Sequence, residues 1–258
     1  MTPVPLAEAA GLRMRYREWG AQRKDAGTPI VLLHGAGSSS VTWMDLGRRL
    51  GTQRHSIAPD LPGHGQSAPL PHATSISIDG YRDLVGWLCA TVGLARALLV
   101  GHSMGGAIAL SAALAWPEKV AGLAMVASGA RLPVSERTLV AIRDHFPTLP
   151  DLMALTCYSP ETPRAVAERW ARVTMQAPRE TVLADFEACA RFDLRARLPE
   201  LRVPMLGIAA ADDLMVPAKV VRELGGRVIE YERAGHNLQH EHPEALARDL
   251  LGFAAQLD

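Results

Sequence analysis

The feature that most constrains this chain is a five-residue turn, residues 101–105, which read GHSMG. An apolar run over 97–100 precedes it and a small-residue apolar run over 107–110 follows it, which predicts a buried strand and then a buried helix. The G-x-S-x-G pattern is typical of a nucleophile elbow, a turn too sharp for side chains at its flanks. Its two glycines lack a Cβ, so strand and helix can lie close together. The sequence therefore predicts a strained turn with an exposed hydroxyl at Ser103, near a helix N-terminus that favours negative charge.

Buried strands alternate with helical patterns along most of the chain. Residues 29–33, 120–127 and 203–209 are continuous apolar runs, as expected for parallel strands that are covered on both faces. Strands that alternate with helices indicate a parallel sheet with helices on both sides. We therefore predict an α/β fold with a doubly wound, mostly parallel sheet.

The pattern changes between residues 131 and 198, where we find helical segments and no convincing strand. Proline in the first turn predicts helices that begin at Ser159-Pro160 and at Ala177-Pro178. Because this block lies between two strand–helix stretches, we interpret residues 131–198 as an inserted helical cap. The core domain then comprises residues 1–130 and 199–258.

Composition excludes several classes of function. The chain has 258 residues, of which 48% are hydrophobic, enough for one large core. Lys+Arg and Asp+Glu both number 27, so no basic excess points to a nucleic-acid partner. No apolar run is long enough to span a membrane, and the N-terminus does not read as a signal peptide. The three cysteines form no disulfide or metal pattern, so we expect a cytoplasmic protein.

Four chemically interesting features directly follow predicted strands: residues 34–37, Ser103, Asp213 and His236. Parallel strands end at a common edge of the sheet, so we expect these features to lie together. A serine hydroxyl is a weak nucleophile until a neighbouring base takes its proton, and histidine suits that role near neutral pH. A carboxylate then orients the imidazole and stabilises the imidazolium.

With these residues in place, the chain resembles the α/β-hydrolase family over nearly its whole length. The chain order of Ser103, Asp213 and His236 is the order that this family uses. The motifs that carry the resemblance are His34-Gly35, DLPGHGQS at 60–67, GHSMGG at 101–106, Asp213 with Val216-Pro217, and Gly235-His236 with Glu241 and Pro243.

The resemblance implies a role for each of these residues. Ser103 is the expected nucleophile, His236 the base and Asp213 the orienting acid. The backbone N–H groups of Ala36 and Met104 are the expected oxyanion hole.

The acid loop departs from the family pattern at one position. The family usually has glycine three residues before the acid, where this chain has Ala210. Asp212 is the alternative acid. We prefer Asp213 because it keeps the family's four-residue spacing to Pro217.

The remaining histidines point to loop structure rather than to a metal. His34 is expected to hydrogen-bond the backbone of the oxyanion loop, and His64 and His102 are expected to shape their loops. Residues 236–242 contain three histidines and a glutamate, but Asn237 occupies the place where the zincin pattern needs glutamate. The glycine-rich turn also lacks the lysine of a phosphate loop. We therefore predict neither a metal nor a cofactor.

A serine at the elbow argues against haloalkane dehalogenases and epoxide hydrolases, which resemble this chain but use aspartate there. We predict a serine carboxylesterase that cleaves small or medium apolar acyl esters. The alternatives are an enol-lactone hydrolase, a meta-cleavage-product carbon–carbon bond hydrolase, and a ligand-binding receptor on the same fold. Gln239 resembles the loop of the carbon–carbon hydrolases, although it can also be a solvated residue at a helix start.

The predicted cap is rich in apolar side chains, and these either line an acyl pocket or form the core of the cap. They are Leu139, Ile142, Phe146, Leu152, Met153, Leu155, Trp170, Val173 and Phe186.

Overall fold

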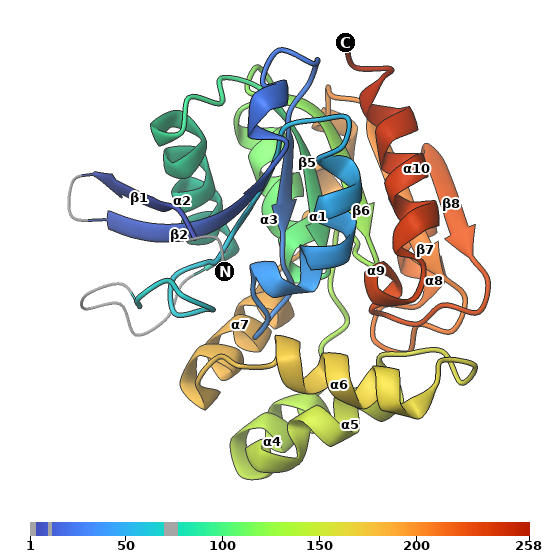
Figure 1. The fold of residues 1–258 in the computed structure, drawn as a ribbon. Helices are drawn as coiled ribbons and strands as arrows, with labels where there is room; N and C mark the ends of the chain where they lie inside the picture. The colour runs from blue at the N-terminus through green and yellow to red at the C-terminus, as the bar shows by residue number, and fades with distance from the viewer. Residues whose placement is uncertain (1–3, 10–11, 70–76) are drawn as a thin grey trace.

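The computed structural model describes residues 4–9, 12–69 and 77–258. Its strands are β1 (Leu6–Ala9), β2 (Leu12–Trp19), β3 (Ile30–Leu33), β4 (Ser56–Pro59), β5 (Ala97–His102), β6 (Val120–Val126), β7 (Met205–Ala210) and β8 (Arg227–Tyr231). They form one eight-stranded sheet in the order β1-β2-β4-β3-β5-β6-β7-β8 (Figure 1). β2 is antiparallel to both of its neighbours, and β4, β3 and β5 to β8 run parallel. The predicted, mostly parallel sheet is thus confirmed.

The central strands are buried on both faces because their residues are apolar at every position. In β3, Ile30 and Leu32 pack against one helical layer, and Val31 and Leu33 pack against the other. The first layer contains α1 (Met44–Leu50) and α10 (Pro243–Ala254), and the second contains α2 (Ile78–Thr91), α3 (Met104–Ala115) and α8 (Ala218–Arg222). Helices on both faces make this the doubly wound α/β fold that the alternation of strands and helices predicts.

Four helices occupy the chain between β6 and β7: α4 (Glu136–Asp144), α5 (Leu149–Thr156), α6 (Arg164–Thr174) and α7 (Arg179–Arg191). We call residues 131–198 the helical segment. It lies at the end of the sheet where the parallel strands terminate (Figure 1). Its only β contact among the described residues is an isolated bridge between Arg131 and Asp193. The predicted domain boundaries stay a prediction.

One of the two predicted helix starts in the helical segment is correct. α7 begins at Arg179, directly after Ala177-Pro178. The start predicted at Ser159-Pro160 is wrong, because residues 159–162 form a turn and α6 begins only at Arg164, after Pro163. The physical reason is local: Pro163 has no N–H to donate inside a helix that starts at Pro160, and it disfavours a helical conformation at Thr162, so the helix begins only after it.

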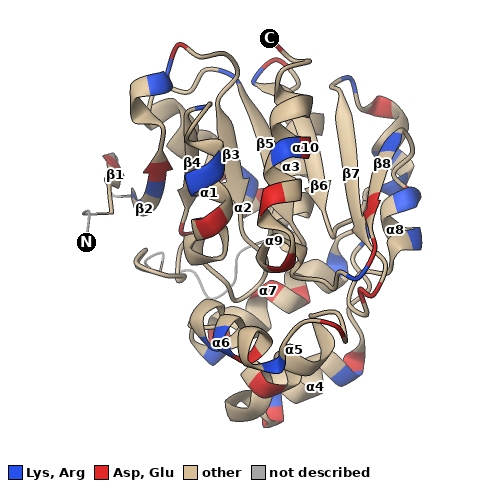
Figure 2. Ribbon diagram, turned by 45° about the vertical axis from the view of Figure 1, so that its right-hand side comes forward, with Lys and Arg blue, Asp and Glu red and all other residues tan. Residues whose placement is uncertain are grey.

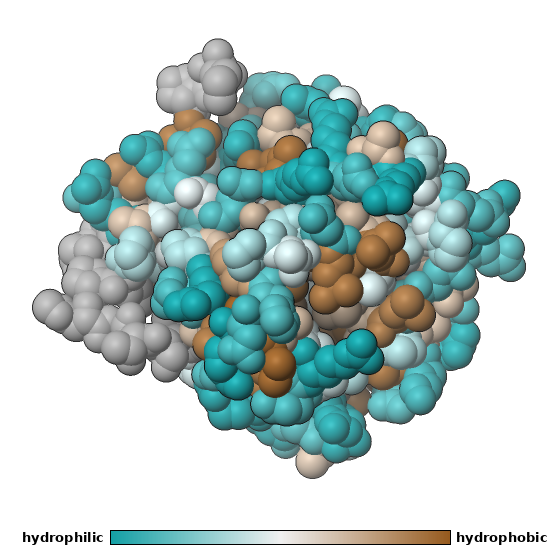
Figure 3. Space-filling view, turned by 90° about the horizontal axis from the view of Figure 1, so that it is seen from below, coloured by the Kyte–Doolittle hydropathy of each residue, from teal (hydrophilic) through white to brown (hydrophobic). Residues whose placement is uncertain are grey.

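Charge and hydrophobicity are distributed differently over the surface. Basic and acidic residues are interspersed along the outer helices (Figure 2). On the face of the helical segment, hydrophobic side chains gather among polar ones (Figure 3). In the helical segment, Leu152 and Leu155 of α5 and Val173 of α6 are exposed. Those three residues therefore belong neither to a core nor to a closed pocket.

Candidate active site

Ser103 lies between β5 and α3, in the strained turn that the sequence predicts. Its φ of 52° and ψ of −118° lie in a region that side chains other than glycine rarely adopt. A Cβ on Gly101 would lie 2.1 Å from the carbonyl oxygen of Gly105, and a Cβ on Gly105 would lie 2.2 Å from that of Leu33. The two glycines therefore let strand and helix approach closely enough to hold Ser103 in this conformation.

Asp213 follows β7, His236 follows β8, and the two side chains meet. The Nδ1 of His236 donates to Oδ2 of Asp213 at 2.8 Å, and both side chains are buried. The other carboxylate oxygen accepts the backbone N–H groups of Met215 and Val216, both at 2.8 Å. Because Nδ1 carries the proton, Nε2 of a neutral His236 has a free lone pair and can act as a base.

Asp212 has a different contact. Its Oδ2 accepts the Ser159 hydroxyl at 2.6 Å, so its side chain ties the strand edge to the helical segment. The structure thus places Asp213, and not Asp212, against His236. The two adjacent carboxylates therefore differ in which neighbour each one faces.

The loop that follows β3 presents backbone N–H groups beside Ser103. Among the described residues, neither Ala36 nor Met104 donates its backbone N–H in a hydrogen bond. The Nδ1 of His34 donates to the carbonyl oxygen of Gly35 at 2.9 Å, while its Nε2 accepts from the N–H of Leu61 at 3.1 Å. The expected contact between His34 and the loop backbone is confirmed. Burial, and then the nearby His64, lower the pKa of His34 to about 4, so its ring stays neutral.

Ser103 and His236 line one small cavity of about 30 Å³, together with Gly35, Ala36 and Asn237. The Ser103 hydroxyl makes no hydrogen bond among the described residues, although Ser103 and His236 line the same cavity. The remaining wall is mostly apolar and comes largely from the helical segment, through Met153, Ala171, Thr174, Met175 and Phe186, with Met215 from the acid loop. Of the apolar residues singled out in the predicted cap, Met153 and Phe186 line this cavity.

His102 supports the loop that carries His236. Its Nε2 donates to the carbonyl oxygen of His236 at 2.9 Å, and the two ring centroids are 4.7 Å apart. Burial, and then the nearby His236, lower the pKa of His102 well below its usual value. The expectation that His102 shapes its loop agrees with this contact.

With this geometry established, the chain can be compared with known proteins. A sequence profile of the alpha/beta hydrolase family matches residues 30–249. This chain belongs to the alpha/beta hydrolase family.

Similar proteins within and around that family carry out varied reactions. The chain is 31% identical to the dihydrolipoyllysine-residue acetyltransferase component of the acetoin cleaving system of Pseudomonas putida, over 97% of this chain and 69% of that protein. It is 28% identical to the pimeloyl-[acyl-carrier protein] methyl ester esterase of Vibrio vulnificus, over 91% of this chain and 97% of that protein. The solved enol-lactonase of Burkholderia xenovorans superposes with a TM-score of 0.86 at 25% identity, over 97% of this chain and all of that one. Two of these names, the esterase and the enol-lactonase, are those of hydrolases, and the first is that of an acetyltransferase component. They do not agree on one substrate.

Two carboxylates of this alpha/beta hydrolase make contacts that the sequence does not predict. Glu241 accepts the backbone N–H groups of Gly235 and Ser159, and so ties the His236 loop to the helical segment. Asp185 is fully buried on α7 and bonds the loop after β3. Its signal in the sequence is a carboxylate three residues after the apolar Val182, a spacing that places the two side chains on one side of a helix.

Gln239 corrects one sequence interpretation. The reading of Gln239 as a solvated helix-start residue is wrong, since the side chain is 1% exposed. Its Nε2 donates to the hydroxyl of Thr42 at 3.0 Å and, more weakly, to Oδ1 of Asn237 at 3.4 Å. Asn237 lines the cavity and Gln239 does not, so Gln239 contacts the cavity wall through Asn237.

His240 packs against an aromatic ring and is not part of a group that could hold a metal ion. Its ring stacks on Trp170 with centroids 4.2 Å apart, and its nitrogens bond Thr42 and Tyr158. Within residues 4–9, 12–69 and 77–258, no group of three or more His, Cys, Asp or Glu side chains is arranged to hold a metal ion. In the same part of the chain, no helix is long and apolar enough to cross a membrane.

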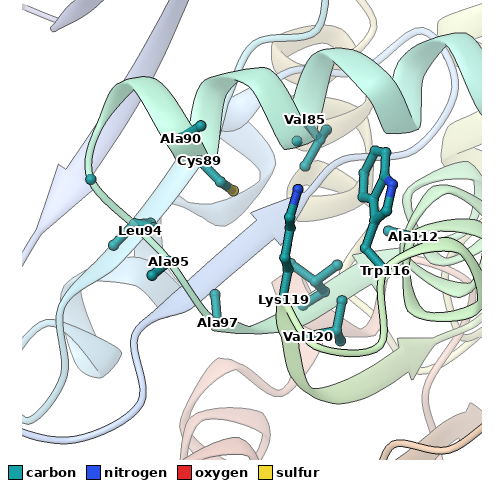
Figure 4. Close-up of a pocket in the computed structure, with 13 residues that line it drawn as sticks. Val85, Cys89, Ala90, Leu94, Ala95, Ala97, Ala112, Trp116, Lys119 and Val120 are labelled. Atoms are coloured by element: carbon teal, nitrogen blue, oxygen red, sulfur yellow. The ribbon is translucent and has the colours of Figure 1, made fainter.

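A second hollow lies far from Ser103, between α2 and the first residues of β5 and β6 (Figure 4). It measures about 260 Å³ and is mostly apolar, with Cys89, Trp116 and Lys119 among its lining residues. None of the predicted catalytic residues contacts it. Its size therefore does not bear on the chemistry at Ser103.

Proposed function

We propose that this alpha/beta hydrolase is a serine esterase that cleaves carboxylic esters with small or medium apolar acyl groups. The observation that carries the proposal is the 2.8 Å hydrogen bond between His236 and Asp213, made beside the cavity that Ser103 also lines. This bond sets the tautomer in which Nε2 of His236 can accept a proton. Ser103, His236 and Asp213 are then the nucleophile, the base and the orienting acid.

The reaction follows from these roles. Nε2 of His236 takes the hydroxyl proton as Ser103 attacks the ester carbonyl carbon. The N–H groups of Ala36 and Met104 stabilise the oxyanion, and each such donor typically lowers the barrier by about 3 kcal/mol. His236 then protonates the leaving alcohol, and afterwards deprotonates the water that hydrolyses the acyl-enzyme. Asp213 stays ionised throughout.

The cavity supports the proposed preference for smaller acyl groups. At about 30 Å³ it has room for about two water molecules. Its apolar wall includes two flexible methionine side chains, Met153 and Met175, which can move aside for a modest acyl chain. In this proposal residues 131–198 act as the cap that determines which acyl groups fit.

An enol-lactone hydrolase is the second candidate, and the superposition on a solved enol-lactonase supports it. A lactone is an internal ester, so the same three residues can open it by the same steps. The carbon–carbon bond hydrolase and the ligand-binding receptor stay alternatives for the case in which the folded protein turns over neither an ester nor a lactone.

The test is hydrolysis of p-nitrophenyl esters from acetate to decanoate, followed by an enol-lactone. We expect turnover that falls with acyl length, and a loss of about 10³-fold or more in kcat for Ser103→Ala. Ser111→Ala is the matched control, because Ser111 lies on the same helix and bonds Asp79. Turnover of the lactone alone would favour the second candidate. No turnover from folded protein on either substrate would contradict both proposals.

A further inference from the structure

The most unusual buried group outside the proposed triad is the carboxylate of Asp185. Asp185 is on α7, the last α-helix of the helical segment, and its side chain is fully buried. Oδ2 accepts the N–H of Gly37 at 2.9 Å and Nε2 of His64 at 2.8 Å, and Oδ1 accepts the hydroxyl of Tyr81 at 2.7 Å. A charge without solvent is tolerated only when it is paired and hydrogen-bonded, as this one is.

We propose that Asp185 is a positioning residue, through which the helical segment holds the oxyanion loop in its working shape. The inference rests on the proposed function, because it assumes that the N–H of Ala36 faces the oxyanion. The contact partner, Gly37, directly follows Ala36. Asp185 touches neither Ser103 nor His236, so it acts through the loop and not on the substrate.

Both peptide units that flank Ala36 are held by side chains. Gly35 C=O and Ala36 N–H belong to one trans peptide, so they point in opposite directions. The His34 ring holds that carbonyl on one side, which directs the Ala36 N–H away from His34. Asp185 holds the next N–H, that of Gly37, from the side of the helical segment. The loop can therefore not rotate either peptide without breaking a buried hydrogen bond.

Close packing leaves the loop no alternative path past α7. Gly37 has a φ of +67°, and a Cβ there would lie 2.6 Å from Sδ of Met175 and 2.9 Å from Cγ2 of Val182. A Cβ on Gly63 in the neighbouring loop would lie 3.2 Å from Oγ1 of Thr181. The start of α7 thus sits directly on both loops, and Asp185 is the charged group at that contact.

His64 completes the arrangement as an imidazolium. Its Nδ1 lies 3.1 Å from the carbonyl oxygen of Pro62, and its Nε2 lies 2.8 Å from Asp185. Both partners are acceptors, so both ring nitrogens must donate, which only the protonated ring can do. Burial lowers the pKa of His64, but the charge and hydrogen bond of Asp185 outweigh burial and raise that pKa above its ordinary value. The adjacent His34 stays neutral, so the pair carries one positive charge opposite Asp185.

The main test is Asp185→Asn, which keeps the shape of the side chain and removes its charge. We expect kcat on a short p-nitrophenyl ester to fall by about 10- to 100-fold, with KM within about twofold of the unchanged protein. Glu187→Gln makes the same chemical change on the same helix, where Glu187 pairs only loosely with Arg191 at 3.9 Å. This control should leave kcat unchanged.

Tyr81→Phe separates positioning from stability. It removes a hydrogen bond from the same carboxylate, but from Oδ1, which Gly37 does not use. We expect a lower melting temperature with kcat within about twofold. If Asp185→Asn keeps full kcat, or if Tyr81→Phe lowers kcat as much as Asp185→Asn does, the positioning role is wrong.

If Asp185→Asn does not fold, a measurement on the wild-type protein tests the proposal instead. Nitrogen-15 NMR at pH 7 should find protons on both ring nitrogens of His64 and one proton, on Nδ1, in His34. A neutral His64 would overturn the proposal. Failure of the proposed function looks different: ester turnover would then be absent, or would survive Ser103→Ala, whatever happens at Asp185.

Discussion

The sheet and the helical segment both contribute to the cavity at Ser103, but they fix their side chains by different physical means. At the elbow, backbone atoms meet backbone atoms, and a Cβ on Gly101 or Gly105 would lie about 2 Å from a carbonyl oxygen. The helical segment has one backbone hydrogen bond to the His236 loop, from the N–H of Asn237 to the carbonyl oxygen of Cys157, but it is also joined to the strand edge through side chains, namely the Ser159 hydroxyl on Asp212 and the Glu241 carboxylate on the Ser159 N–H. Backbone contacts cannot adjust, whereas side-chain contacts can be changed one residue at a time.

Burial follows the same division. The strands β3, β5 and β6 are buried at every residue. Of the exposed large hydrophobic residues in the described chain, all but Leu214 lie in the helical segment, namely Val140, Leu152, Leu155, Val166 and Val173. The difference teaches that the position of Ser103, the proposed nucleophile, is determined by a tightly packed core. In the proposed function, the fit of the substrate is left to a region whose packing is looser.

The largest expected effect distinguishes the two adjacent carboxylates. Asp213→Asn should lower kcat by about 10⁴-fold, because an amide at that place no longer favours the proton on Nδ1 of His236. Asp212→Asn should lower kcat less than about tenfold, since the Asp212 carboxylate accepts from Ser159 of the helical segment and not from His236. Steady-state kinetics on a short ester measures both. The reverse order would place the orienting acid at Asp212.

The second effect compares two glycines. Gly105→Ala should destabilise the protein by about 3 kcal/mol or more, because the added methyl would overlap the carbonyl of Leu33. Gly252→Ala is the matched control: it lies inside α10 with nothing within 4 Å of the added methyl, and alanine there should stabilise by up to about 1 kcal/mol. Urea unfolding followed by circular dichroism measures both. Equal effects would mean that the elbow is not closely packed.

The third effect is a loss of stability in mild acid. Burial lowers the pKa of His34 to about 4 and that of His240 to about 3, so both stay neutral when folded and take up protons on unfolding. As pH falls from 6.5 to 5, the unfolded state binds more protons, and these two histidines should remove roughly 3 to 4 kcal/mol of stability. His64 does not oppose this loss of stability. Because its pKa is raised in the folded protein, the stability that it contributes is present below pH 6.5 and is lost only as the pH rises above that value.

Urea unfolding at several pH values between 7.5 and 5 measures this slope. His240→Gln cannot gain a proton, so it should make the slope clearly shallower. His240 stacks on Trp170 of α6, so this variant also reports how the helical segment contributes to the acid sensitivity. A slope that is the same in both proteins would show that His240 is protonated when folded.

The smallest effect concerns substrate fit. Met153→Ala should raise kcat/KM for p-nitrophenyl hexanoate relative to acetate by about tenfold, because Met153 forms part of the cavity wall. Leu155 lies on the same helix but is 69% exposed, so Leu155→Ala should change neither this ratio nor, beyond about 0.5 kcal/mol, the stability. A ratio unchanged by Met153→Ala would mean that acyl chains do not lie against α5.

The sequence by itself determined the features that depend on local sterics and on chain order. The apolar runs predicted the strands of the parallel sheet, because strands covered on both faces admit few polar residues. The glycines around Ser103 predicted the sharp turn, because only residues without a Cβ fit there. The short strand β1 was not predicted, since its four residues carry no distinctive pattern and are defined by antiparallel pairing with β2.

Only the tertiary structure decided what depends on contacts between distant residues. Asp212 and Asp213 are chemically identical neighbours, and their different partners come from β8 and from the helical segment. Asp185 reads in the sequence as a polar interruption of an apolar helix face. Its partners Gly37, His64 and Tyr81 lie more than 100 residues earlier in the chain, so only folding brings them to one carboxylate.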